Sequence, residues 1–160
     1  MPKWFIGPNV FSAKVMSPTE AAYMAAFIDG EGTIGIYRAK RGANRSGYRL
    51  QPALTMNNTH FGVLQRLQEM CGNGRLLQQT NPAKPHHKTG YALRLYPQQI
   101  RHVLPQVRPF LIVKASQADV VLEFLSIVRQ TKGRTQEELD REMSLRDTVC
   151  GLNARGVRVQ

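Results

Sequence analysis

Residues 17–32 read SPTEAAYMAAFIDGEG, a segment with a strongly marked helix start. Ser17 can cap a helix, Pro18 suits the first helical turn, and Glu20 stands where a capping box requires an acid. The pattern predicts a helix that stops at Asp29-Gly30-Glu31-Gly32. Because the helix is apolar all round, both of its faces are expected to be buried, one by its own domain and the other by another surface.

Small side chains mark one row of this helix. Ala22 and Ala26 are four residues apart and therefore share a side, where the backbone of another helix could come close. The row predicts that a second helix packs there.

Two carboxylates, Asp29 and Glu31, lie between glycines at the end of the predicted helix. A divalent cation assists hydrolysis of a phosphodiester, and such ions prefer carboxylate and carbonyl oxygens. One interpretation is therefore a metal site at this helix end. The alternative is an ordinary helix end in which Asp29 bonds to its own turn.

The rest of the chain predicts an α+β fold with an α-β-β-α-β-β-α core and an antiparallel four-stranded sheet. A single domain is expected over residues 1–160, with an N-terminal extension over 1–16 and a flexible tail over 151–160. Strands are expected over residues 33–41, 48–56, 75–80 and 91–96. Helices are expected over residues 60–71, before Pro105, over 116–130 and from Thr135 to about Cys150.

Composition narrows the class of protein. The chain has 160 residues and a formal charge of +11, and 42% of its residues are hydrophobic, which excludes a disordered basic tail. No apolar run is long enough to cross a membrane. Cys71 and Cys150 fit no metal spacing and suit a reducing compartment, either an organelle or a bacterial or phage-infected cytoplasm.

The positive charge is unevenly distributed. Residues 1–118 hold 15 Lys and Arg against four acidic residues, whereas residues 119–160 hold seven of each sign. This asymmetry predicts a polyanion-binding face within the first part of the chain. The alternative is a solvated basic surface without a partner.

Strand alternation makes that face concrete, because it directs Arg, Gln, Thr and Tyr side chains outward, and these side chains read base edges. We expect the following residues to contact DNA: Thr33, Tyr37, Arg38, Lys40, Arg41, Arg45, Arg49, Gln51, Thr55, Arg75, Gln79, Lys84, Lys88 and Arg94.

Two segments resemble a known family. Met24–Gly32 (MAAFIDGEG) resembles the motif of the LAGLIDADG homing endonucleases in its D-G-E-G form, with Ala26 where glycine is common. Pro109–Asp119 (PFLIVKASQAD) resembles the family's P-F-L-x-x-K-x-x-Q-A-N segment. With a matching order of helices and strands, the chain is similar to single-motif, homodimeric members of group I intron type.

The resemblance implies an active site. Glu31 takes the acidic position that ligates Mg²⁺ in the family, a site that Mn²⁺ or Ca²⁺ can also occupy, and the carbonyl of Gly30 would assist. Lys114 takes the basic position, where it would offset charge on the phosphate or help to activate water. Asp29 is interpreted as a structural cap of the motif helix.

Further active-site positions are expected after the second strand, in the stretch MNNTH. Either Asn57 or Asn58 would supply the family's amide. His60 stands in place of the usual Arg or Lys, which would change the pH dependence of cleavage.

A chain with one motif implies a homodimer in which two motif helices pack about a two-fold axis. The predicted interface consists of Ala22, Tyr23, Ala25, Ala26 and Asp29. The expected partner is a long, near-palindromic double-stranded DNA, cut in both strands with staggered ends, and neither a membrane nor a small-molecule cofactor is expected. Two alternatives stay open: an RNA maturase of the same family that assists intron splicing, and a non-catalytic DNA-binding regulator on the same fold.

Overall fold

A computed structural model describes residues 6–40, 48–80, 86–128 and 135–154. Their order confirms the α+β class and the α-β-β-α-β-β-α core. In chain order the elements are α1 (Pro18–Glu31), β1 (Gly32–Lys40), β2 (Tyr48–Asn58), α2 (Phe61–Cys71), β3 (Arg75–Gln79), β4 (Gly90–Leu95), α3 (Pro97–Val107), the 3₁₀ turn η1 (Arg108–Phe110), α4 (Ala115–Ile127) and α5 (Gln136–Asn153).

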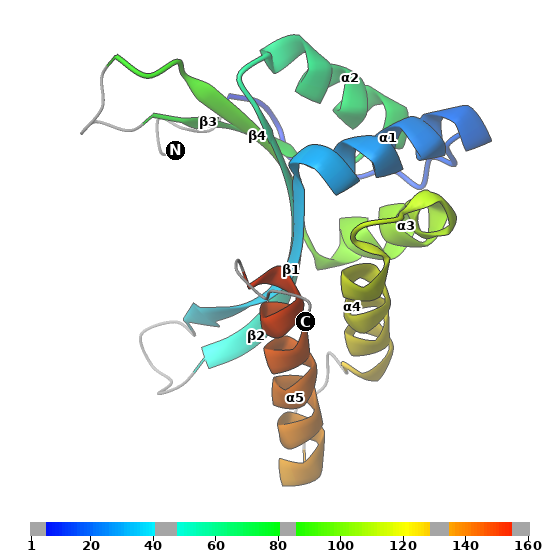
Figure 1. Cartoon of the computed structure of the whole chain (residues 1–160), viewed down its shortest axis with the longest axis vertical. Coiled ribbons are helices and arrows are strands. Elements are labelled where there is room, and N and C mark those ends of the chain that lie inside the picture. The colour runs from blue at the N-terminus through cyan, green and yellow to red at the C-terminus, as the bar shows by residue number, and fades with distance from the viewer. Residues whose placement is uncertain (1–5, 41–47, 81–85, 129–134, 155–160) are drawn as a thin grey trace, which may run out of the picture.

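The four strands form one antiparallel sheet in the order β1-β2-β4-β3. Helices α1 to α4 lie on one side of it, and the sheet curves so that both of its ends bend toward the other side (Figure 1). No helix of the described residues lies across the middle of that other side, which we call the uncovered face (Figure 1). The sheet therefore separates an apolar layer from a face open to a partner.

One hydrophobic core holds the layers together. Strand alternation turns Ile34, Ile36 and Leu54 toward the helices, where they are buried. Met24 and Ile28 of α1 meet them there, and the same core extends to α4. The described elements thus share a single apolar interior, and none of their helices is long and apolar enough to span a membrane.

The start of α1 confirms the predicted capping box. The Ser17 hydroxyl accepts a hydrogen bond from the Glu20 N–H at 3.2 Å, and the Glu20 carboxylate accepts one from the Ser17 N–H at 2.9 Å. The helix ends at Glu31, within the predicted stop over residues 29–32, and passes directly into β1 at Gly32. The acidic residue is therefore the last residue of the helix.

Helix α3 differs from its prediction, because it continues past Pro105 to Val107. Proline removes one backbone donor and usually ends a helix. Here Val103, Leu104 and Val107 are all fully buried, so tertiary packing keeps the last turn helical. Local propensity alone could not indicate this outcome.

The described part of the N-terminal extension is integrated into the domain. Val10 pairs with Gly74 in an isolated β-bridge. The buried Asn73 side chain accepts from the Ser12 N–H at 3.2 Å and donates to the Ser12 carbonyl at 2.9 Å. The Gln99 side chain of α3 donates to Asn9 and to the Val10 carbonyl, so this part of the extension links α3 to the turn between α2 and β3.

Helix α5 packs beside the edge strand β1 (Figure 1). It ends at Asn153, three residues later than predicted, and the Asn153 amide donates to the Ile34 carbonyl at 2.7 Å. This contact satisfies a carbonyl of the edge strand, which would otherwise be available to another chain. Residues 155–160 of the expected tail lie outside the described ranges.

Gly74, just before β3, provides a test of the packing against β4. Its φ of 108° disfavours a side chain, and an added methyl group would lie 2.7 Å from Cδ1 of Leu93. We expect Gly74→Ala to lower the free energy of unfolding by about 2 kcal/mol in denaturant titrations. Gly7→Ala is the matched control, because no atom of the described residues lies within 4 Å of the added methyl group. Equal stability of both variants would contradict the close packing of Gly74 against Leu93.

Candidate active site and nucleic-acid interface

The junction between α1 and β1 positions Glu31. A methyl group at Gly32 would lie 2.7 Å from the Ile28 carbonyl oxygen, so only glycine allows the helix to enter the strand so directly. Glu31 is exposed at this junction. A methyl group at Gly30 would meet no described atom within 4 Å, so the surface beside the carboxylate is open in one protomer.

Asp29 is bonded to another segment and not to its own turn. Its carboxylate accepts from the N–H of Ile112 at 2.8 Å and of Lys114 at 2.9 Å. Burial raises the pKa of Asp29, but the N–H groups of Ile112, Lys114 and Val113 outweigh this effect and hold the pKa below its usual value. The ionised carboxylate thus anchors residues 112–114, and the alternative of a local turn contact is wrong.

Lys114 also lies at the end of α1. Its ammonium group donates to the carbonyl oxygens of Ile28 at 2.9 Å and Asp29 at 2.5 Å. The Ile28 carbonyl also accepts from the Gly32 N–H, and carbonyls in the last turn of a helix carry partial negative charge that favours a cationic group. The structure therefore places the Lys114 ammonium group on main-chain oxygens of the last turn of α1, the turn that ends at Glu31.

The structure distinguishes the two candidate amides. Strand β2 continues to Asn58, so both asparagines belong to the strand and not to the segment after it. Asn58 accepts from the His60 N–H at 2.8 Å. Alternation turns Asn57 to the uncovered face, and its buried Oδ1 has no hydrogen-bond partner among the described residues. Asn57 is therefore the amide with an acceptor oxygen available.

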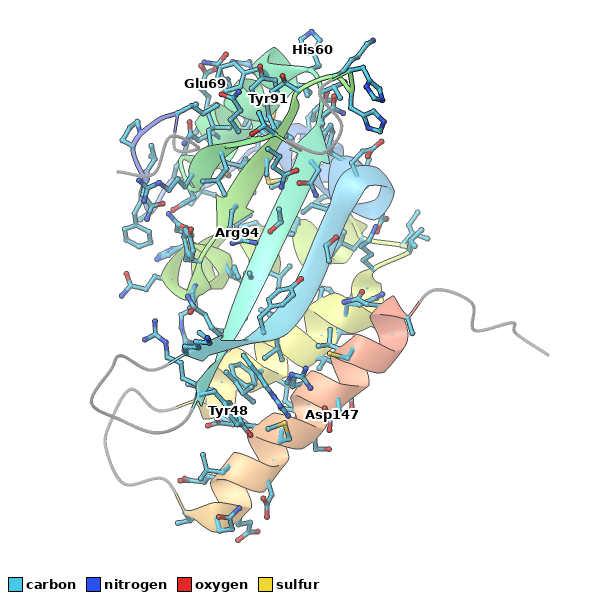
Figure 2. All side chains as sticks on the ribbon, turned by 90° about the vertical axis from the view of Figure 1, so that its left-hand side faces the viewer. Tyr48, His60, Glu69, Tyr91, Arg94 and Asp147 are labelled. Carbon is cyan, nitrogen blue, oxygen red and sulfur yellow. The ribbon has the colours of Figure 1, made fainter. Side chains whose placement is uncertain are left out.

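His60 begins α2. Its Nδ1 accepts from the Val63 N–H at 3.2 Å, which caps the helix. Figure 2 shows His60 at the end of the molecule, away from Arg94 in the middle of the uncovered face. His60 therefore has a structural role as a helix cap, which the sequence interpretation did not consider.

A row of polar residues crosses the uncovered face. Thr33 pairs with Thr55, Thr55 with Arg94, and Arg94 with Arg75, so the row spans all four strands. The Arg94 Nε donates to the Thr55 hydroxyl at 3.3 Å. Arg94 on the inner strand β4 and Arg75 on the edge strand β3 concentrate positive charge on that half of the uncovered face, where Figure 2 shows Arg94.

The other predicted contact residues divide into three groups. Alternation places Tyr37, Arg49, Gln51 and Gln79 on the uncovered face as well, and Lys88 is exposed just before β4. The predicted residues outside the described ranges are Arg41, Arg45 and Lys84.

The structure corrects the predicted contact of Arg38 and Lys40 with DNA. Both share the strand face of Ile34 and Ile36, which is opposite to the uncovered face. The Arg38 guanidinium lies 4.7 Å from the centre of the Tyr48 ring, and its Nη2 lies 3.7 Å from the sulfur of Met143 in α5. These two basic residues therefore turn away from the row of Arg75 and Arg94.

One side of α1 lacks a partner within the described chain. Tyr23 is 48% exposed, Ala26 is exposed and Ala22 is half-buried, as a helix–helix contact would need. Ala25 is fully buried in the protomer's own core, so its assignment to the predicted interface is wrong. Asp29 was expected there too, but its carboxylate is directed to residues 112–114.

Two exposed apolar residues were missed by the sequence interpretation. Ile112 is 85% exposed and Val113 is 69% exposed, and both lie beside Asp29. The signal in the sequence was a pair of β-branched apolar residues between Pro109 and Lys114, outside any predicted helix or strand. Their exposure extends the apolar surface beside α1.

The oxygen donors at the end of α1 suit a hard cation such as Mg²⁺. Glu31 offers a carboxylate, Gly30 a carbonyl and Asn57 a buried amide oxygen without a described partner. Within the described ranges, no group of three or more His, Cys, Asp and Glu side chains could hold a metal ion. A single protomer therefore offers few charged ligands, and a cation bound here would need water, phosphate or a second chain as further ligands.

Solved structures of homing endonucleases share this fold. The homing endonuclease I-CvuI in complex with its target matches with a TM-score of 0.73 and 22% identity, over 89% of this chain and 87% of that chain. The archaeal intron-encoded homing endonuclease I-Vdi141I complexed with DNA matches with a TM-score of 0.72 and 20% identity, over 89% of each chain.

A third match differs in length. The I-SmaMI LAGLIDADG homing endonuclease bound to cleaved DNA matches with a TM-score of 0.67 and 19% identity, over 95% of this chain but 47% of that chain. No family model and no curated protein matches the chain by sequence. The similarities establish that the chain has the fold of LAGLIDADG homing endonucleases.

Proposed function

We propose that two copies of this chain form a site-specific DNA endonuclease that hydrolyses phosphodiester bonds with a divalent cation. The proposed cation is Mg²⁺. The substrate is a long, near-palindromic duplex, and cleavage of both strands leaves staggered ends. One observation carries the proposal: the exposed Glu31 lies where α1 enters a sheet whose uncovered face carries Arg75 and Arg94. The structural neighbours crystallised with DNA support it.

Each residue at the helix end has a chemical role in this proposal. Glu31 and the Gly30 carbonyl would hold the cation, which acts as a Lewis acid on the scissile phosphate and supports activation of water. The Asn57 Oδ1 can accept a hydrogen bond from a water molecule or a base. Lys114 adds positive charge next to these groups and holds the main chain that precedes Glu31.

The dimer follows from the number of acidic centres. A chain with one such centre has one site, whereas cleavage of two strands requires two. The exposed row of α1 fits a second copy of α1 across a two-fold axis, which would bring both Glu31 carboxylates to the middle. The 47% coverage of I-SmaMI is in keeping with a chain that corresponds to half of a longer enzyme.

The sheet would provide recognition. A twisted antiparallel sheet can lie in the major groove of DNA, where Arg, Gln and Thr side chains reach base edges. The row from Thr33 to Arg75 runs across all strands, so each protomer would read one half of the target. Symmetry of the protein then requires symmetry of the DNA sequence.

We expect Glu31→Gln to abolish cleavage and to preserve DNA binding. The substitution keeps the shape of the side chain but removes its charge, which should lower the cleavage rate by roughly a hundredfold or more. Glu69→Gln, on an exposed position of α2, is the matched control and should cleave normally. Cleavage should stop with EDTA and return with Mg²⁺. Normal cleavage by Glu31→Gln would refute the assignment of the metal site.

We expect Ala26→Leu to weaken the dimer without unfolding the protomer. Ala26 is exposed in one chain, so a larger side chain costs little until a second helix must pack there. The dimer dissociation constant should rise about tenfold or more in sedimentation equilibrium. Ala154→Leu, at an exposed position after α5, should leave it unchanged. A wild-type monomer that cuts both strands would overturn the two-fold arrangement.

We expect DNA binding to weaken steeply as salt rises, because bound phosphates release counterions. Arg94→Gln should reduce the slope of log affinity against log salt by about 1. Arg66→Gln, on an exposed position of α2, should leave the slope as in the wild type. Fluorescence anisotropy at several salt concentrations measures both. An unchanged slope for Arg94→Gln would show that the uncovered face is not the DNA-binding face.

A further inference from the structure

The end of α1 and the segment before α4 are joined by a reciprocal set of hydrogen bonds, which we call the Asp29–Lys114 clamp. The Asp29 carboxylate accepts from the main chain of Ile112 at 2.8 Å and of Lys114 at 2.9 Å. In return, the Lys114 ammonium group donates to the main-chain carbonyls of Ile28 and Asp29. Each segment therefore holds the main chain of the other through a charged side chain.

The clamp acts on a helix end that needs external support. The last turn contains Gly30, and glycine lowers the stability of a helix relative to alanine. Gly30 is exposed, and no described atom would lie within 4 Å of an added methyl group. The carbonyls bound by Lys114 belong to the two residues just before Gly30. Without the clamp, the turn that carries the Gly30 carbonyl and Glu31 would be free to fray.

The clamped segment also faces away from its own core. Ile112 and Val113 are among the most exposed apolar residues of the described chain, and both flank the N–H groups that bind Asp29. They lie at the C-terminal end of α1, where their segment binds the Asp29 carboxylate. A second copy that packs on α1 would cover apolar surface here, and this burial would favour the pairing. In such a dimer the same segment would contact the partner through its exposed side chains, while its main chain binds the end of α1.

We propose that Asp29 is a positioning residue that fixes the last turn of α1 and Lys114 relative to the partner-facing residues Ile112 and Val113. Pairing of two chains then sets the position of Glu31 through the clamp. The proposal rests on the proposed endonuclease function and deepens it, because it assigns a coupling between dimer formation and the acidic centre. Asp29 touches neither cation nor DNA in this account and acts through the main chain.

The principal variant is Asp29→Asn. It preserves the size of the side chain, but its amide nitrogen cannot accept the second N–H, and the charge that strengthens both bonds is lost. We expect the single-turnover cleavage rate to fall at least about tenfold, because small misplacements at a reacting centre are costly. The KM for DNA and the dimer dissociation constant should stay unchanged. The Mg²⁺ concentration for half-maximal rate should rise.

A second variant removes the opposite half of the same bond. Ile112→Pro lacks the N–H that Asp29 binds, and Leu111 already has the extended backbone that precedes proline, with φ −71° and ψ 134°. Because the substitution also changes a partner-facing side chain, it should show the same fall in rate at protein concentrations that keep the variant dimeric. Asp119→Asn is the matched control, because this carboxylate binds the side chain of Arg108 and should leave the rate unchanged. All rates are measured well below the melting temperature of each variant.

The coupling has its own test. In the double variant Ile112→Ser with Val113→Ser, the clamp stays but the apolar contact is lost, so the rate should fall at low protein concentration and recover when the dimer is restored by mass action. Asp29→Asn should not recover with concentration. Recovery of both variants, or of neither, would overturn the coupling.

The outcomes separate this proposal from the proposed function. If the wild type cleaves and both clamp variants cleave at its rate, the clamp has no positioning role, while the endonuclease function stands. If the wild type cleaves no duplex with Mg²⁺, the proposed function itself is wrong. Hydrogen exchange on the wild type supplies an independent check: the amide protons of residues 112 and 114 should exchange slowly despite the exposed side chain of Ile112. Fast exchange of both would contradict the clamp.

Discussion

The direct passage from α1 into β1 is the constraint on which the rest of the structure depends. Gly32 permits it, because any side chain at this position would collide with the Ile28 carbonyl. The passage leaves no loop between the helix layer and the sheet, so the last residue of the helix, Glu31, lies at the boundary between the core side and the uncovered face. Asp29 and Lys114 stabilise the same turn from outside. The Glu31 carboxylate, the Lys114 ammonium group and an open surface are thereby held at one end of α1.

The register of the strands explains where the basic residues gather on the sheet. Burial of Ile34, Ile36 and Leu54 fixes the strand register, and the register in turn aligns Thr33, Thr55, Arg94 and Arg75 across the sheet. The basic row therefore depends on the same core that supports α1. Neither the helix end nor the sheet has another described element covering it at these positions, so both are available to one extended partner (Figure 2).

Much of this arrangement could be predicted from sequence, because it depends on local patterns. The capping box at Ser17, the strand alternation and the glycine after Cys71 each act through neighbouring residues, and the structure confirms the elements they predicted. Contacts between distant segments could not be predicted. The choice between Asn57 and Asn58 depends on where pairing with β4 ends, and the direction of the Lys114 side chain depends on carbonyls 85 residues away. Arg38 and Lys40 were predicted to contact DNA, although strict alternation along β1 places them on the opposite face.

Selection of cleavable sequences from a randomised duplex library in Mg²⁺ tests the central claim most directly, because it reports activity, symmetry and specificity together. The account predicts recovery of one long, near-palindromic family of sites, cut in both strands with a fixed stagger about the centre. Recovery of no cleaved sequence, or of an asymmetric site cut by a single protomer, would contradict it.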